Sequence, residues 1–214
     1  MKKLLVAFIV TVMSIPSFSQ TFSIRAGMNL SNMLMKDDDD TYSDEFQMNP
    51  GFHFGGTVEV PINEALFFEP GLLVSTTGFL IKESDPTFGE MKISTMIYNL
   101  NIPLNLKAYV NAGSSARVYF SAGPYIGIAL SGKSKSTFNG TTDTEDLEIG
   151  SADTDDIKAF DFGLQAGAGI EISSFQIGVT YGLGLANIST FTDNGSKILN
   201  RVLGISVGYK LGGE

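Results

Sequence analysis

Cysteine and tryptophan are both absent from the 214 residues, and histidine occurs only once, at His53. Without cysteine the chain can form no disulfide, zinc–thiolate site or thiol nucleophile. It also has no residue to which the lipid of a bacterial lipoprotein could be attached. A single imidazole leaves one candidate for histidine-based acid–base chemistry.

Positive charge is scarce as well. The chain has 14 basic and 23 acidic residues, a formal net charge of −9, which argues against nucleic acid as a partner. By contrast, it has 24 glycines, 16 phenylalanines and 7 tyrosines. Abundant glycine and aromatic residues with few charges are typical of a β protein anchored by aromatic side chains.

Long hydrophobic runs are also missing. The apolar run from Leu4 to Ile15 has about 12 residues, whereas a membrane-spanning helix needs about 20. A basic start precedes this run and small residues follow it before Gln20, as in a secretory signal. We therefore expect residues 1–19 to be a cleaved signal peptide and residues 20–214 to form one domain. The alternative is a short membrane-anchoring helix.

The rest of the chain alternates between polar connectors and stretches in which apolar and polar residues follow each other with period two, which predicts strands. The clearest stretch runs from Tyr98 to Lys107. We expect a bulge or a strand end near Pro103, because proline cannot donate a ladder hydrogen bond. The eight predicted strands cover about residues 22–30, 51–62, 66–81, 98–107, 117–131, 158–172, 175–188 and 198–211.

The connectors alternate in length. Those after the second, fourth and sixth stretches are short, and the others are longer, at residues 31–50, 82–92, 132–157 and 189–197. Short periplasmic turns that alternate with long external loops are typical of outer-membrane barrels. We predict an all-β fold, an eight-stranded antiparallel up-and-down transmembrane β-barrel in the cell outer membrane, with both termini on the periplasmic side.

A soluble lipocalin-like barrel is the alternative fold. Its polar face would be rich in lysine, glutamate and aspartate, because that face would meet water. Here the polar face carries mainly glycine, serine, threonine and asparagine, as at Gly163, Gly167 and Gly169. Small residues suit the narrow lumen of an eight-stranded barrel, so the pattern favours the transmembrane form.

Eight charged residues nevertheless fall on the polar face, four of each sign. Buried charges persist only when they are paired, and all but Asp161 fall in the periplasmic half of the predicted lumen. We predict a salt-bridged plug there, and the alternative is a charged constriction in a pore. The predicted lumen charge network consists of Arg25, Glu59, Glu69, Lys107, Arg117, Asp161, Glu171 and Lys210.

Aromatic residues near the strand ends predict two girdles at the membrane surfaces, although ordinary β-propensity is an alternative explanation. The inner girdle would contain Phe22, Phe67, Phe68, Tyr109, Phe120, Phe175 and Tyr209, and the outer one Phe52, Phe79, Tyr98 and Phe160.

Two connectors are acidic. The first contains Asp37 to Asp40, Asp44 and Glu45, and the third contains seven acidic residues between Asp143 and Asp156. Their spacing does not match an EF-hand loop. We expect solvated, flexible loops that keep the surface anionic. The alternatives are a Ca²⁺ or Mg²⁺ site and loose bridging of divalent cations to lipopolysaccharide phosphates.

His53 falls in the predicted lumen and has no serine-containing elbow beside it. We expect it to make a lumen hydrogen bond. The sequence predicts no catalytic residue, no cofactor and no enzyme activity.

Several short motifs recur along the predicted strands. They are IRAGMNLSN at residues 24–32, PGFHFGG at 50–56, EPGLL at 69–73, NIPL at 101–104, AGPY at 122–125 and DFGL at 161–164. With these motifs the chain resembles the outer-membrane β-barrel domain family of Bacteroidetes often labelled PorT-like. The resemblance implies an eight-stranded barrel similar to those of OmpA and OmpX, and no single activity. The last strand departs from the usual pattern because it does not end on an aromatic residue.

Together these features favour a structural or interaction scaffold of the cell envelope, with acidic surface loops and a charge-plugged lumen. Its partners would be outer-membrane lipid, lipopolysaccharide and surface proteins that meet the external loops. The alternative is a narrow porin-like channel for small solutes or ions. Balanced lumen charges favour the scaffold, because a pore filter would carry a ring of one sign.

Overall fold

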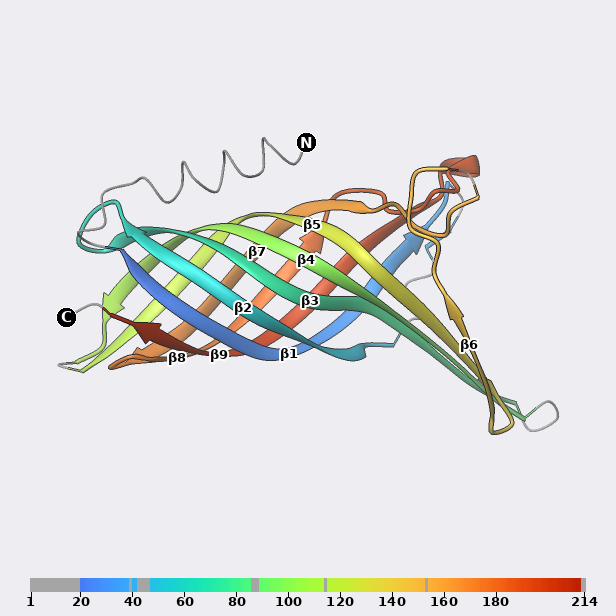
Figure 1. The fold of residues 1–214 in the computed structure, drawn as a ribbon, viewed down its shortest axis with the longest axis horizontal. Coiled ribbons are helices and arrows are strands. Elements are labelled where there is room, and N and C mark those ends of the chain that lie inside the picture. Colours follow the sequence, from blue (N-terminus) through green and yellow to red (C-terminus); the bar gives the residue numbers. More distant parts are fainter. Residues whose placement is uncertain are drawn as a thin grey trace.

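The computed structural model describes residues 20–38, 40–41, 47–85, 89–113, 115–152 and 154–212. The predicted signal peptide lies outside the described residues, as do residues 42–46 of the first acidic connector. Nine strands account for most of the described chain (Figure 1). They are β1 Thr21–Lys36, β2 Asn49–Pro61, β3 Leu66–Asp85, β4 Gly89–Asn111, β5 Ala116–Phe138, β6 Thr141–Asp146, β7 Phe160–Ile172, β8 Phe175–Gly184 and β9 Lys197–Leu211.

Eight of these strands close into a ring. The sheet order is β4-β3-β2-β1-β9-β8-β7-β5-β6, and an additional β4–β5 pairing joins the two sides. Every pairing is antiparallel, and β6 lies outside the ring because it pairs only with β5. The prediction of an eight-stranded antiparallel up-and-down barrel is therefore confirmed.

The strand register requires the strands to be strongly tilted relative to the barrel axis. A row of paired residues that starts at Asp161 on β7 returns to the same strand at Glu171, an offset of 171 − 161 = 10 residues. Strands in a closed barrel must tilt to accommodate such an offset, so residues of one row lie at different heights in the lumen. The row passes through Asp161, Gly127, Asn101, Leu73, Gly55, Arg25, Gly208, Gln176 and Glu171.

The two faces of the ring have the inverse polarity of a soluble protein. Phe22, Ile24 and Met28 on β1 point outward and are about half exposed or more, whereas Ser23 and Asn29 point inward and are buried. The same alternation continues around the ring. Apolar side chains on the outside and polar ones inside suit a barrel that is surrounded by lipid.

One end of the barrel carries the short turns, the start of β1 and the end of β9, and is called here the turn end (Figure 1). The opposite, loop end extends into an arm. There β3 and β4 remain paired up to Asp85 and Gly89, and β5 and β6 form a further hairpin. The prediction of loops at 82–92 and within 132–157 was wrong, because pairing continues where both sheet faces meet water and the apolar alternation disappears.

Pro103 does not interrupt its strand. β4 continues through this residue to Asn111, and the proline side chain is fully buried in the lumen. The register shift lies instead between Tyr98 and Asn99, where Leu130 of β5 is the extra residue. Pairing with β3 skips Ile102 and Pro103, and pairing with β5 skips Leu104 and Asn105, but neither register changes there. The predicted bulge or strand end near Pro103 was therefore wrong.

Helical structure is nearly absent from the part of the chain that the structure describes. The 3₁₀ turn η2, Asp193–Gly195, lies between β8 and β9. Among the described residues, no helix has the length and apolar character needed to cross a membrane.

Candidate lumen site

The structure brings seven of the eight predicted lumen charges into one hydrogen-bonded network in the turn-end half of the barrel. Lys107 lies at its centre and has no solvent exposure. Its Nζ atom donates to Glu59 Oε1 at 2.8 Å and to Glu69 Oε2 at 2.6 Å. Gln176 provides a third acceptor for the same ammonium at 3.2 Å. This lysine is therefore satisfied by side chains from three other strands.

The remaining cations complete the network around the same carboxylates. Lys210 Nζ lies 2.6 Å from Glu59 Oε2 and 2.9 Å from Glu171 Oε2. Arg117 pairs with Glu171 through its Nε and Nη2 groups, and Arg25 Nη2 donates to both Glu69 oxygens at 3.2 Å. β1, β2, β3, β4, β5, β7 and β9 all contribute a charge, so the network ties together strands from all around the ring.

Asp161 stands apart from this network. Its Oδ2 atom accepts hydrogen bonds from Tyr125 at 3.1 Å and Asn200 at 2.9 Å, and no cation pairs with it among the described residues. The expectation that four charges of each sign would pair is therefore wrong for this residue. The reason is distance along the strand, because Asp161 lies ten residues from Glu171 on β7 and therefore near the opposite end of that strand from the network.

Sequence reasoning missed Tyr109, which it assigned to the inner aromatic girdle. Tyr109 is buried in the lumen, where its hydroxyl oxygen lies 2.6 Å from Glu59 Oε1 and 2.9 Å from Glu171 Oε2 and its one proton is shared between them. Phe67, also assigned to the girdle, packs edge-on against its ring. Parity would have identified both, because Tyr109 is in phase with Lys107 on β4 and Phe67 with Glu69 on β3. Phe22, Phe120 and Phe175 do face outward.

Apolar side chains close the loop-end half of the lumen. The buried cluster contains Met33 and Ile97 from strands and Ile157 and Ile188 from the loops. Leu147 and Ile149, from the connector between β6 and β7, pack against it. The lumen is therefore occupied by two different kinds of side chain, ionic at the turn end and apolar at the loop end.

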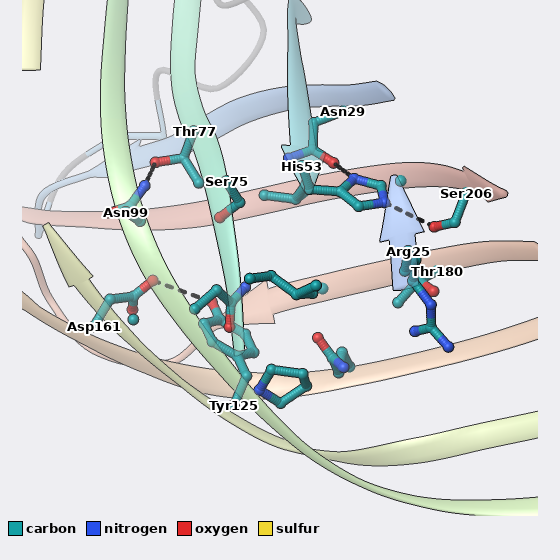
Figure 2. A pocket seen from close by; sticks show the side chains of 18 residues that line it. Arg25, Asn29, His53, Ser75, Thr77, Asn99, Tyr125, Asp161, Thr180 and Ser206 are labelled. Atoms are coloured by element: carbon teal, nitrogen blue, oxygen red, sulfur yellow. Dashed lines mark hydrogen bonds between the residues drawn. The ribbon is translucent and has the colours of Figure 1, made fainter. Parts of the chain in front are cut away.

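A cavity of about 80 Å³ lies in the lumen, lined by both polar and apolar residues (Figure 2). Arg25 from the charge network and Asp161 both line it, on opposite sides of the view in Figure 2. His53, Asn29 and Ser206 form part of the wall.

His53 is hydrogen bonded through both ring nitrogens, as predicted for a lumen residue. Its Nδ1 atom lies 2.8 Å from Asn29 Oδ1, and its Nε2 atom lies 2.8 Å from Ser206 Oγ. Asn29 Nδ2 donates to two carbonyl oxygens, those of Phe52 and Thr76, so its oxygen must face His53 and accept from Nδ1–H. Nε2 is then the acceptor of the Ser206 hydroxyl proton.

Ser206, His53 and Asn29 are hydrogen bonded in the order of a catalytic triad. Acyl transfer also requires an oxyanion hole. An oxyanion hole needs preorganised N–H donors that point at the reacting centre. Ser206 lies within β9, where the backbone amides of neighbouring residues pair with β1 and β8. The arrangement therefore supports a structural role for His53.

The acidic residues of the third connector are distributed over β6 and the loop that follows. Asp143, Glu145 and Asp146 lie on β6 and are exposed. Asp155 Oδ2 accepts from the Ala152 amide at 2.7 Å, and Asp156 Oδ2 accepts from the Glu148 amide at 2.8 Å. Within the described residues, no three histidine or acidic side chains gather in a way that could hold a metal ion.

An all-antiparallel closed ring with an apolar outer face and a polar, ion-paired lumen defines an integral β-barrel membrane protein. Residues 18–190 match the family described as Outer membrane protein beta-barrel domain. The chain belongs to this family, and its location is the outer membrane. No curated protein matches the chain.

Solved outer-membrane barrels are similar to the chain over most of its length. Ail, the attachment invasion locus protein of Yersinia pestis, is 15% identical with a TM-score of 0.40, and the match covers 91% of this chain and 100% of Ail. OprG from Pseudomonas aeruginosa is 15% identical with a TM-score of 0.47, covering 91% and 97%. Neisserial surface protein A is 11% identical with a TM-score of 0.44, covering 89% and 97%.

Proposed function

We propose that the protein is a non-conducting, non-enzymatic scaffold of the outer membrane, whose contacts with other molecules are made by its surface and loop-end arm. The observation that carries this proposal is the network centred on Lys107. Seven charged side chains and Tyr109 cross-link the turn-end half of the lumen, where a solute-conducting pore would need open space.

Charge balance supports a plug in preference to a filter. The network contains four basic and three acidic side chains, intermixed around the ring. An ion-selective constriction uses a ring of one sign. The apolar cluster of Met33, Ile97, Ile157 and Ile188 also obstructs the loop-end half.

The arm is the proposed contact surface. β6, TTDTED, is exposed at every position, and one of its edges has no partner strand among the described residues. It carries Asp143, Glu145 and Asp146, which suit basic surface proteins and divalent cations that bridge to lipopolysaccharide phosphates. Within the family we assign the chain to the Bacteroidetes PorT-like group, on the motifs in strands β1 to β5 and β7.

Single-channel recording of the refolded protein in planar bilayers tests the plug. We expect wild type to be silent, and Glu69→Gln and Lys107→Met to leak, because each variant removes one partner from the buried charges that close the lumen. Lys133→Met is the matched control, since Lys133 pairs with Asp146 on the exposed arm at 3.1 Å and lies outside the barrel. Steady, ion-selective current through wild type would overturn the plug and favour the porin-like channel.

A further inference from the structure

The cavity in the middle of the lumen has two walls of opposite electrostatic character. One wall contains Arg25 and the other contains Asp161 (Figure 2). From these walls we infer that the cavity is a binding site for a small zwitterion, a molecule that carries an ammonium and a carboxylate on one or two carbons. Its carboxylate faces Arg25, and its ammonium faces Asp161.

The wall around Asp161 is rich in unused hydrogen-bond acceptors. Asp161 Oδ1, Asn101 Oδ1 and Ser75 Oγ are buried and have no hydrogen-bond partner among the described residues. Asp161 is 8% exposed and Ser75 is 4% exposed. Buried acceptors normally have a donor, and the Asp161 and Asn101 oxygens can only accept, so together they indicate a ligand that brings N–H groups. An ammonium carries three.

Register explains how these acceptors flank a gap. Asn101 of β4 pairs with Gly127 of β5, and Gly127 pairs with Asp161 of β7. The outer two residues are therefore two strand spacings apart, about 10 Å between their backbones. Gly127 has no side chain to fill the space between them, and a Cβ built there would lie 3.4 Å from Asp161 Cβ. Gly127 therefore leaves the space between these two side chains open.

The wall around Arg25 supplies donors and positive charge. Arg25 uses only Nη2 to bind Glu69, and its Nε and Nη1 groups make no hydrogen bond to the part of the chain that the structure describes. The network behind it has one more cation than carboxylates, four against three, so positive charge is in excess on this side. Guanidinium groups recognise carboxylates through pairs of N–H donors.

Size restricts the ligand further. A cavity of about 80 Å³ accommodates roughly five to eight water-sized probes, which matches the smallest α-amino acids. A lone cation would leave the Arg25 wall unmatched, and a lone anion would leave the acceptors at Asp161 unmatched. A zwitterion satisfies both walls without adding net charge to the lumen.

The test uses the full-length mature barrel, refolded in detergent in the presence of ¹³C-glycine, so that entry into the lumen does not limit binding. Equilibrium dialysis then measures the bound fraction. We expect saturable binding of glycine at one site, and at least tenfold weaker binding of acetate and of methylammonium. Equal binding of methylammonium and glycine would overturn the zwitterion and leave a cation site, and no saturable binding of glycine would overturn the proposal.

Two variants locate the site. Asp161→Asn should weaken glycine binding at least tenfold, whereas Asp155→Asn, the same change in the connector after β6, should leave it unchanged. Gly127→Ala places a methyl group in the gap at an ordinary contact distance, so the barrel should fold and glycine binding should be lost. Gly56→Ala, on the outward face of β2, is its control. Unaltered binding in both Asp161→Asn and Gly127→Ala would overturn the assignment to this cavity.

Discussion

Lys107 Nζ lies 2.6 Å from Glu69 Oε2, and neither side chain is more than 1% exposed. Their strands, β3 and β4, are neighbours in the ring, and the same ammonium reaches Glu59 on β2. Charges this deeply buried are tolerated only when their partners are present. The stability of the barrel should therefore depend strongly on the completeness of the network.

Lys107→Met should lower the free energy of unfolding by about 3–5 kcal/mol, because it leaves Glu59 and Glu69 as buried carboxylates without their shared cation. Urea unfolding of the refolded barrel in micelles measures the change. Lys133→Met, on the exposed arm, should cost at most about 1 kcal/mol. Equal effects of the two substitutions would show that the lumen pair contributes no more than a surface pair.

A double variant separates lost charge pairing from lost packing. Lys107→Met combined with Glu69→Gln removes one charge of each sign from the network. The double variant should lose about 0.5–3 kcal/mol less unfolding free energy than the sum of the two single variants, because the effects of substitutions at contacting residues are not additive. A double-mutant cycle from the same urea titrations gives this number, and strict additivity would contradict direct coupling.

Tyr109→Phe should cost about 1–3 kcal/mol of unfolding free energy, because the lost hydroxyl shares its proton between Glu59 and Glu171 and both carboxylates are buried. Tyr98→Phe is the matched control, because Tyr98 lies on the opposite face of β4 against Phe52. Its substitution should change stability by less than about 0.5 kcal/mol. If Tyr109→Phe were as silent as its control, Tyr109 would not be part of the plug.

Gly27→Ala should destabilise the barrel by about 1–3 kcal/mol, because of overpacking. A Cβ at this position would lie 2.0 Å from the Ile205 carbonyl oxygen and 2.5 Å from His53 Cε1. Gly56→Ala on the neighbouring strand meets only the Ser23 carbonyl oxygen, at 3.5 Å, and should be nearly neutral. Thermal unfolding followed by circular dichroism compares the two, and a neutral Gly27→Ala would contradict close seating of the His53 ring.

Val179→Arg tests which face of the ring meets lipid. Val179 lies midway along β8 and points outward, so the arginine should cost about 2–4 kcal/mol in a bilayer. Thr142→Arg, on exposed β6, should cost almost nothing. Folding titrations into lipid vesicles measure both, and a tolerated Val179→Arg would place this face in water.

Period-two alternation alone predicted most of the lumen correctly. It assigned Arg25, Glu59 and Lys107 to the polar face, and each of these side chains is inside the ring. The same rule, applied consistently, would have placed Tyr109 beside Lys107. The girdle prediction is wrong at Tyr109 because aromatic residues near strand ends are typical of membrane-surface girdles, whereas parity along the strand decides which face the side chain takes.

The arm could not be predicted in the same way. Outside the membrane both faces of a sheet meet water, so the residues of β6 and of the outer parts of β3, β4 and β5 lack the apolar alternation that marks a strand. Side-chain pairs such as Lys133 with Asp146 and Thr137 with Thr142 link β5 to β6. Such pairs depend on the register of the two strands, which the local sequence pattern does not give.

The sequence by itself determined the class of fold and the polarity of each face, because alternation is a local property that each strand carries on its own. Only the tertiary structure decided which charges meet. Asp161 and Glu171 lie on the same face of the same strand, yet Glu171 joins the network and Asp161 lines the cavity. Ten residues of β7 already put these two carboxylates at different depths, whereas the partners that each one meets, such as Lys210 of β9 for Glu171, are set by strand register around the closed ring.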